Sequence, residues 1–188
     1  MSFRKCVLAS LNGVILLLCG CDKPAARAQS LPPAPANPAS IAPTNAPFGF
    51  SPTNAQPKLK TIKLWLGPEV ITAELALSVP QIMTGMMFRK EMAENEGMLF
   101  VFARPHQVSF YMRNTLLALS CAYIDPDGTI LELHDMKPLD ETPIPAKSDN
   151  VQYVLEMKQG WFERHKVAVG SVVRTEVGSL PETLFRRR

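Results

Sequence analysis

The feature that most constrains the fold is a short apolar run, Met98–Phe102, near the middle of the chain. The run is too short for an ordinary helix and is typical of a strand that is buried on both faces. Arg104-Pro105-His106 follows it. Because proline fixes φ and has no N–H to donate to a strand ladder, this tripeptide predicts a turn. The sequence therefore predicts a doubly buried strand that leads into a hairpin.

The second arm of this hairpin alternates between apolar and polar residues. Val108, Phe110 and Met112 fall on one face, because successive side chains of a strand point to opposite faces. We expect a functional site on the other face, beside the buried strand. That face carries Ser109, Tyr111, Arg113 and Thr115.

The same alternation predicts further short strands, separated by turns, and no rhythm of strands with long helices. We therefore expect a mostly β fold, a compact antiparallel β-sandwich or small barrel with one or two short helices. A helix is expected from Ser78, the N-cap, to around Met87–Arg89, with Met83, Met86 and Met87 directed at the sheet. The other elements expected are strands Leu59–Trp65, Val70–Leu77, Leu116–Ile124, Thr129–His134, Val151–Met157 and Val167–Val173, and a helical turn at Gln159–His165.

Residues 1–21 predict a lipoprotein signal peptide. Arg4 and Lys5 precede an apolar stretch, Val7–Leu18, that is too short to span a bilayer comfortably. Leu18-Cys19-Gly20-Cys21 resembles a bacterial lipobox, in which Cys21 is lipidated and becomes the mature N-terminus. The next residue, Asp22, resembles an inner-membrane retention signal. The alternative is cleavage after Ala28, which would release a soluble periplasmic protein.

The rest of the chain divides into a linker, one domain and a tail. Residues 22–57 contain nine prolines and no apolar periodicity, and so predict a disordered linker rich in proline and alanine. We expect residues 58–174 to form a single β domain and residues 175–188 to form a basic C-terminal tail. Cys121 is the one cysteine beyond residue 21, so no intramolecular disulfide is expected in the mature chain, and we interpret it as an inert core residue.

Charge gives no support for nucleic-acid binding. Between Lys58 and Arg174 there are thirteen Lys or Arg and fourteen Asp or Glu. A domain this close to neutral, with no basic stripe, lacks the electrostatic signature of a nucleic-acid-binding surface.

Several ordered motifs resemble the domain-of-unknown-function 192 family. The resemblance covers roughly residues 70–174, and it implies a compact, mostly β domain that is often exported and has no assigned activity. Where the family usually has Pro-Leu-Asp, this chain has Ala118-Leu119-Ser120, so a carboxylate is missing beside the expected site. The motifs are Gly85–Arg89, Gly97–Phe100, Phe110–Thr115, Ile124–Gly128, Tyr153–Glu156 and Gly160-Trp161.

We interpret the polar residues near the hairpin as a binding site for a small anion. Two guanidinium groups, Arg89 and Arg113, beside hydroxyl groups would suit a carboxylate or a phosphate-like group. In the alternative, Arg89 caps carbonyls or pairs with Glu91, and Arg113 pairs with an acidic side chain across the sheet. An amide on the buried face, Asn114, is expected to tie down a loop. The expected ligand-binding set is Arg89, Tyr111, Arg113, Asn114 and Thr115.

Two other functions stay open. One is a hydrolytic enzyme that uses polar residues around Arg113. The other is copper binding through methionines together with His106 or His134, because thioethers select Cu(I). The sequence assigns no catalytic residue, metal or cofactor. We expect a non-catalytic, lipid-anchored envelope protein on the periplasmic side that binds a small anionic ligand or a partner protein of the envelope, and not nucleic acid.

The lipobox yields a direct prediction. The mature protein should begin at Cys21 and partition with membranes. Cys21→Ser removes the thiol that receives the lipid, so acylation and processing at this site should stop, as measured by membrane fractionation and N-terminal mass spectrometry. A soluble wild-type product that begins at Gln29 would contradict the prediction.

Overall fold

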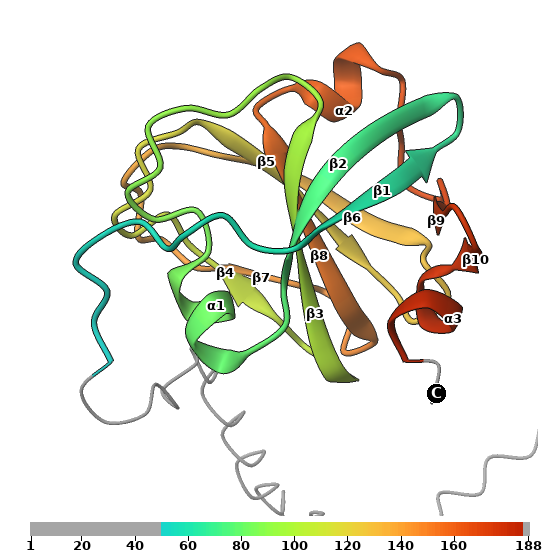
Figure 1. Ribbon diagram of the computed structural model, residues 1–188, viewed down its shortest axis with the longest axis horizontal. Helices are drawn as coiled ribbons and strands as arrows, with labels where there is room; N and C mark the ends of the chain where they lie inside the picture. The colour runs from blue at the N-terminus through green and yellow to red at the C-terminus, as the bar shows by residue number, and fades with distance from the viewer. Residues whose placement is uncertain (1–49, 186–188) are drawn as a thin grey trace, which may run out of the picture. The chain divides into compact units, whose positions relative to one another are not determined.

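The computed structural model describes residues 50–185, in which ten short strands and three short helices form a mostly β fold (Figure 1). Cys21, the signal segment, most of the linker and the last three arginines lie outside the described residues. Eight strands form one sheet in the order β10-β9-β1-β2-β3-β8-β5-β6, and β4 pairs with β7. The strands are β1 Thr61–Leu66, β2 Glu69–Ala76, β3 Glu96–His106, β4 Ser109–Phe110, β5 Leu119–Ile124, β6 Ile130–Met136, β7 Ile144–Pro145, β8 Val151–Lys158, β9 Val173–Thr175 and β10 Gly178–Ser179. The helices are α1 Val79–Thr84, α2 Trp161–Arg164 and α3 Leu180–Leu184.

The predicted mostly β class with short helices is confirmed. The start of β6 meets the segment before β9 at a single bridge, between Thr129 and Val172. The ladders do not close the large sheet into a barrel. The arrangement is therefore compatible with the sandwich alternative, in which the small β4–β7 sheet packs on one face of the large sheet.

One face of the large sheet packs against α2 and α3. The buried apolar side chains between them form a cluster that we call the Trp161 core, after its fully buried indole. It takes Leu99 and Val101 from β3, and Leu155 and Met157 from β8. Because residues at i and i+2 share a face of a strand, the residues between them must point to the opposite side.

The opposite face forms a second cluster, which we call the methionine core. The predicted burial of Met98–Phe102 on both faces is confirmed, because Met98 and Phe100 belong to this cluster while Leu99 belongs to the Trp161 core. The predicted apolar face of Val108, Phe110 and Met112 also packs here. The methionine core comprises Ala76, Met86, Met98, Phe100, Val108, Met112, Leu119, Cys121, Tyr123, Met136, Ala146, Val151 and Val154.

One pair of neighbouring strands departs from the expected antiparallel sheet. β2 and β3 run parallel, with Glu74 opposite Met98, whereas the other ladders of the described chain are antiparallel. Parallel neighbours cannot be joined by a tight turn, so the chain must cross a face of the sheet between them. Residues 77–95 make this crossover and carry α1 onto the methionine core (Figure 1).

The predicted turn at Arg104-Pro105-His106 is wrong. These residues belong to β3, whose pairing with β8 shifts register after Val101 and resumes between His106 and Val151. The expected hairpin does not form either, because β4 pairs with β7. Alternation predicts which side chains share a face, but it does not specify which strand is the partner.

Helix α1 begins as predicted and ends earlier than expected. The Ser78 hydroxyl accepts from the Gln81 N–H, and the Gln81 side chain accepts from the Ser78 N–H. The helix ends at Thr84 because Gly85 follows with φ of +47°, and a Cβ there would lie 3.1 Å from the Phe100 ring. The methionines beyond Thr84 therefore lie on a turn.

The packed domain extends past Arg174. The predicted strand Val167–Val173 is mostly turn, including Gly170 with φ of +89°, and β9 begins only at Val173. Beyond it lie β10 and α3, and Leu180 of α3 is fully buried in the Trp161 core. Residues 175–185 are thus part of the fold rather than a solvated tail.

Candidate functional site

A pocket of about 780 Å³ lies where the crossover turns back toward β3. Three of its lining residues are basic and three are acidic, so their formal charges cancel. Its apolar lining includes Met86, Phe88 and Met92. The charged lining residues are Lys58, Glu74, Arg89, Lys90, Glu91 and Glu96.

Arg89 is held in this pocket by Glu74 of β2. Its Nη2 donates to Glu74 Oε2 over 2.9 Å, and both side chains are only 14% exposed. The same oxygen accepts the Leu59 N–H over 2.7 Å. The Nε–H of Arg89 is buried and has no hydrogen-bond partner among the residues described. Because a buried donor without a partner costs free energy, an anionic oxygen brought to it would be stabilising.

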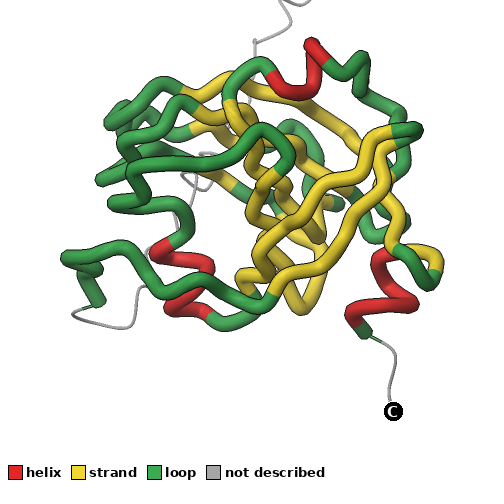
Figure 2. The backbone as a smooth tube through the Cα atoms, turned by 45° about the horizontal axis from the view of Figure 1, so that its top comes forward, coloured by secondary structure: helices red, strands yellow, loops and turns green. Residues whose placement is uncertain are grey.

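The predicted site residues Asn114 and Thr115 join loops, and neither lines this pocket. The Phe88 N–H donates to the Asn114 carbonyl over 2.8 Å, and the Leu139 N–H donates to the Thr115 carbonyl over 3.1 Å. Phe88, Asn114 and Leu139 have φ between 55° and 61°. Residues other than glycine rarely adopt such φ values, which cluster at functional sites. Figure 2 shows these long loops gathered with α1 at one end of the sheet.

Arg113 and Tyr111 lie together on the surface. Arg113 Nε and Nη2 donate to Glu141 Oε2 over 2.9 and 2.7 Å, and both charged side chains are 55% exposed. The Arg113 guanidinium lies 5.4 Å from the centre of the Tyr111 ring. Neither residue lines the pocket. The structure therefore does not bring Arg113 and Arg89 to one pocket. Arg113 pairs with an acidic side chain, as in the alternative interpretation, but the partner lies on a loop and not across the sheet.

Ser120 lies on the opposite face of the sheet from Arg89. It is 2% exposed; its hydroxyl donates to Asp135 and accepts the Gly160 N–H over 2.8 Å. The expectation that position 120 lies beside the expected site is thus wrong, because Ser120 supports the start of α2 instead. The His134 ring points to the other face, where its Nε2 lies 3.1 Å from Glu132. The Ser120 hydroxyl is therefore hydrogen-bonded to a carboxylate and not to a histidine that could activate a nucleophile.

Sequence analysis missed a buried carboxyl group, Glu156 of β8. Its direct cross-strand neighbours are Met98 of β3 and Cys121 of β5. Glu156 is 4% exposed, and its Oε2 has no hydrogen-bond partner in the described chain. Burial away from water raises the pKa of Glu156 to about 8. The available signal was a charged residue between the apolar residues Leu155 and Met157.

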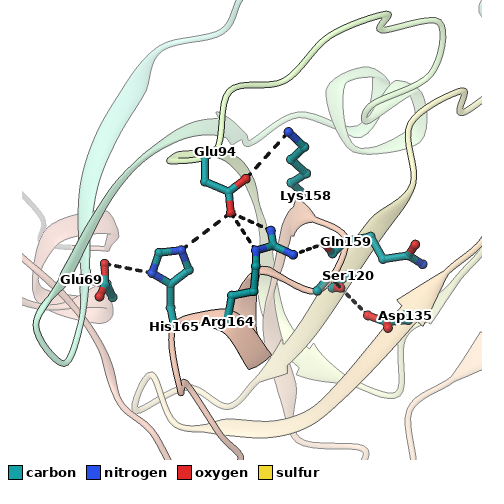
Figure 3. A network of polar contacts seen from close by, with 9 residues as sticks. Glu69, Glu94, Ser120, Asp135, Lys158, Gln159, Arg164 and His165 are labelled. Atoms are coloured by element: carbon teal, nitrogen blue, oxygen red, sulfur yellow. Dashed lines mark hydrogen bonds and ion pairs between the residues drawn. The ribbon is translucent and has the colours of Figure 1, made fainter.

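A cluster of charged side chains fixes the loop that contains Glu94, next to the pocket, to the rest of the domain (Figure 3). Glu94 of this loop accepts from Arg164 Nη2 over 2.6 Å and from Nε over 3.1 Å. The hydrogen bond from Arg164 lowers the pKa of Glu94. Glu94 also lies 3.7 Å from one nitrogen of His165, whose other nitrogen lies 3.2 Å from Glu69. The loop is thereby tied to α2 and, through His165, to the first residue of β2.

Metal sites built from His, Cys, Asp and Glu side chains find no support in the part of the chain that the structure covers. No three His, Cys, Asp or Glu side chains within residues 50–185 lie close enough together to hold a metal ion. Asp125 instead uses Oδ1 to accept the N–H groups of Asp127 and Thr129, as in a turn. In the same range, no helix is long and apolar enough to cross a membrane.

The fold and the pocket define a small mostly β domain with one parallel crossover. A family model, DUF192, described as an uncharacterized ACR, matches residues 63–175, and the chain belongs to this family. The resemblance inferred from the motifs is thereby confirmed for the domain. No curated protein matches the chain.

Two solved structures share the fold. One, from Sinorhizobium meliloti and described as a proposed transcription regulator, is 32% identical with a TM-score of 0.61, over 64% of this chain and 97% of that chain. The other, from Novosphingobium aromaticivorans and of unknown function, is 30% identical with a TM-score of 0.59, over 62% of this chain and 86% of that one.

Glu156 yields a pH-dependent prediction. Its pKa rises from an ordinary 4.5 to about 8 on folding. The contribution of the protonated Glu156 side chain to the free energy of unfolding is therefore fully present below pH 4.5 and is lost as pH rises through about 8. Glu156→Gln keeps the shape and removes the ionisation, so the variant should exceed the wild type at pH 9 by on the order of a few kcal/mol in unfolding free energy.

The measurement is urea unfolding of both proteins between pH 4 and 9. Glu163→Gln, at an exposed position of α2, is the control and should keep the wild-type dependence on pH. Parallel pH profiles for the wild type and Glu156→Gln would contradict the prediction.

Proposed function

We propose that this protein is a lipid-anchored envelope protein whose β domain is a non-catalytic module for binding a small anionic ligand. The observation that carries the proposal is the buried Nε–H of Arg89, which lacks a partner at the wall of an open pocket. A carboxylate is the simplest ligand group that this donor can bind.

The lining of the pocket narrows the class of ligand. Arg89 is already neutralised by Glu74, and Lys58 by Glu96 at 3.3 Å, so the pocket does not present a large excess of positive charge. A multiply charged anion is therefore a poor fit. Met86, Phe88 and Met92 offer apolar contact beside the guanidinium. A monocarboxylate with a short apolar chain satisfies both parts of this surface.

The anchor and the location are parts of the same proposal. The lipobox at Cys21 would attach the domain to a membrane on the periplasmic side, and Asp22 favours the inner membrane. The linker would let the domain reach a ligand or an envelope partner at a distance from the bilayer. The alternative is a soluble periplasmic protein that is cleaved after Ala28.

Calorimetric titration of the chain without residues 1–21 tests the binding proposal. The probes are butanoate, hexanoate and octanoate, each compared with the amide of equal length. The carboxylates should bind, with affinity that rises with chain length, and the amides should bind much more weakly. Arg89→Lys keeps the charge but removes Nε as a donor, so it should weaken binding by about 1–3 kcal/mol.

Arg113→Lys is the matched control, because Arg113 is exposed and lies outside the pocket lining. It should leave affinity unchanged, and thermal unfolding should show that both variants are folded. No binding by any carboxylate, equal binding of acids and amides, or an equal loss in the two variants would overturn the proposal.

A further inference from the structure

The methionines of the described chain are distributed unequally between the two faces of the sheet. Four buried methionines belong to the methionine core, and Met92 packs against it, whereas the Trp161 core holds only Met157. Methionine is a common filler of irregular core space, but both clusters are buried cores of the same sheet. The thioethers of the described chain are thus concentrated on one face of the sheet.

Two further groups that can bind a ligand, the thiol of Cys121 and the carboxyl group of Glu156, lie on this face beside Met98. Cys121 and Met98 are the direct cross-strand neighbours of Glu156, one on each side of it. Met98 and Cys121 are fully buried, and Glu156 presents a buried Oε2 without a hydrogen-bond partner. A thioether, a carboxyl group and a thiol thus stand side by side across three strands. The buried Oε2 of Glu156 has no hydrogen-bond partner in the described chain, which suits a cluster that binds a ligand.

Two methionines connect the open pocket with the methionine core. Met86 and Met92 line the open pocket and also pack in or against the methionine core. Glu74, another lining residue, lies directly opposite Met98 in the β2–β3 ladder. Flexible thioether side chains therefore lie between the pocket and the methionine core that contains Cys121. A buried metal site requires such an entry path.

We propose that Cys121 and Met98, with the surrounding thioethers, form a buried site for a soft monovalent metal ion, Cu(I) or its analogue Ag(I), which enters past Met92 and Met86. Soft sulfur ligands select Cu(I) over harder cations. When the ion binds, a metal–sulfur bond replaces the S–H bond of Cys121, the proton passes to solvent, and no electron is transferred. The site does not use Arg89, so it stands or falls independently of carboxylate binding.

The test uses the full chain with Cys6, Cys19 and Cys21 changed to serine, which leaves Cys121 as the sole thiol. The reduced protein is titrated with Cu(I) against a chromophoric Cu(I) chelator. We expect one ion per chain, no binding in Cys121→Ala, and a loss of affinity of about tenfold or more in Met98→Leu. Met157→Leu, buried on the opposite face, is the matched control and should bind as the parent does.

X-ray absorption at the copper edge then tests the ligands in the parent protein, without reliance on any variant that fails to fold. Sulfur as the dominant scatterer around copper would support the site. Failure of the parent to compete with the chelator, unchanged affinity in Cys121→Ala, an equal loss in Met157→Leu, or a shell of only nitrogen and oxygen would overturn it.

Discussion

The parallel pairing of β2 with β3 is the constraint on which the rest of the structure depends. Two parallel neighbours force the chain between them to cross a face of the sheet, and here that segment carries α1 and the turn that ends at Arg89. The ion pair between Arg89 and Glu74 attaches the crossover to β2, the strand that precedes it. A pocket follows, because the segment is fixed to β2 and to β3 while it arches between them.

Both proposed activities use this one face. The crossover supplies Arg89 to the pocket and Met86 to both the pocket and the core beneath it, so the anion and the soft metal ion share an entrance. From the far side, Glu94 ties the same loop to Arg164 of α2. The strained Phe88 is fastened to Asn114 by a backbone hydrogen bond. The loop is therefore restrained on several sides, which favours a preformed pocket.

Local patterns predicted the elements whose determinants lie within a few residues. The apolar run of β3 and the capping of α1 by Ser78 are of this kind, and the motifs predicted the family. The sequence did not show the partner of β4, the parallel ladder or the place of Ser120, because each depends on contacts between distant segments. Glu156 was missed for a similar reason: its burial is imposed by Met98 and Cys121, which lie on other strands.

Hydrogen–deuterium exchange of Glu74→Gln against the wild type tests most directly whether the ion pair holds the crossover in place. The substitution keeps the side-chain shape and removes the charge that Arg89 contacts. Faster exchange confined to residues 85–96, with β5 and β8 protected as in the wild type, is the result this account predicts. Unchanged exchange in the crossover, or an equal increase throughout the domain, would contradict it.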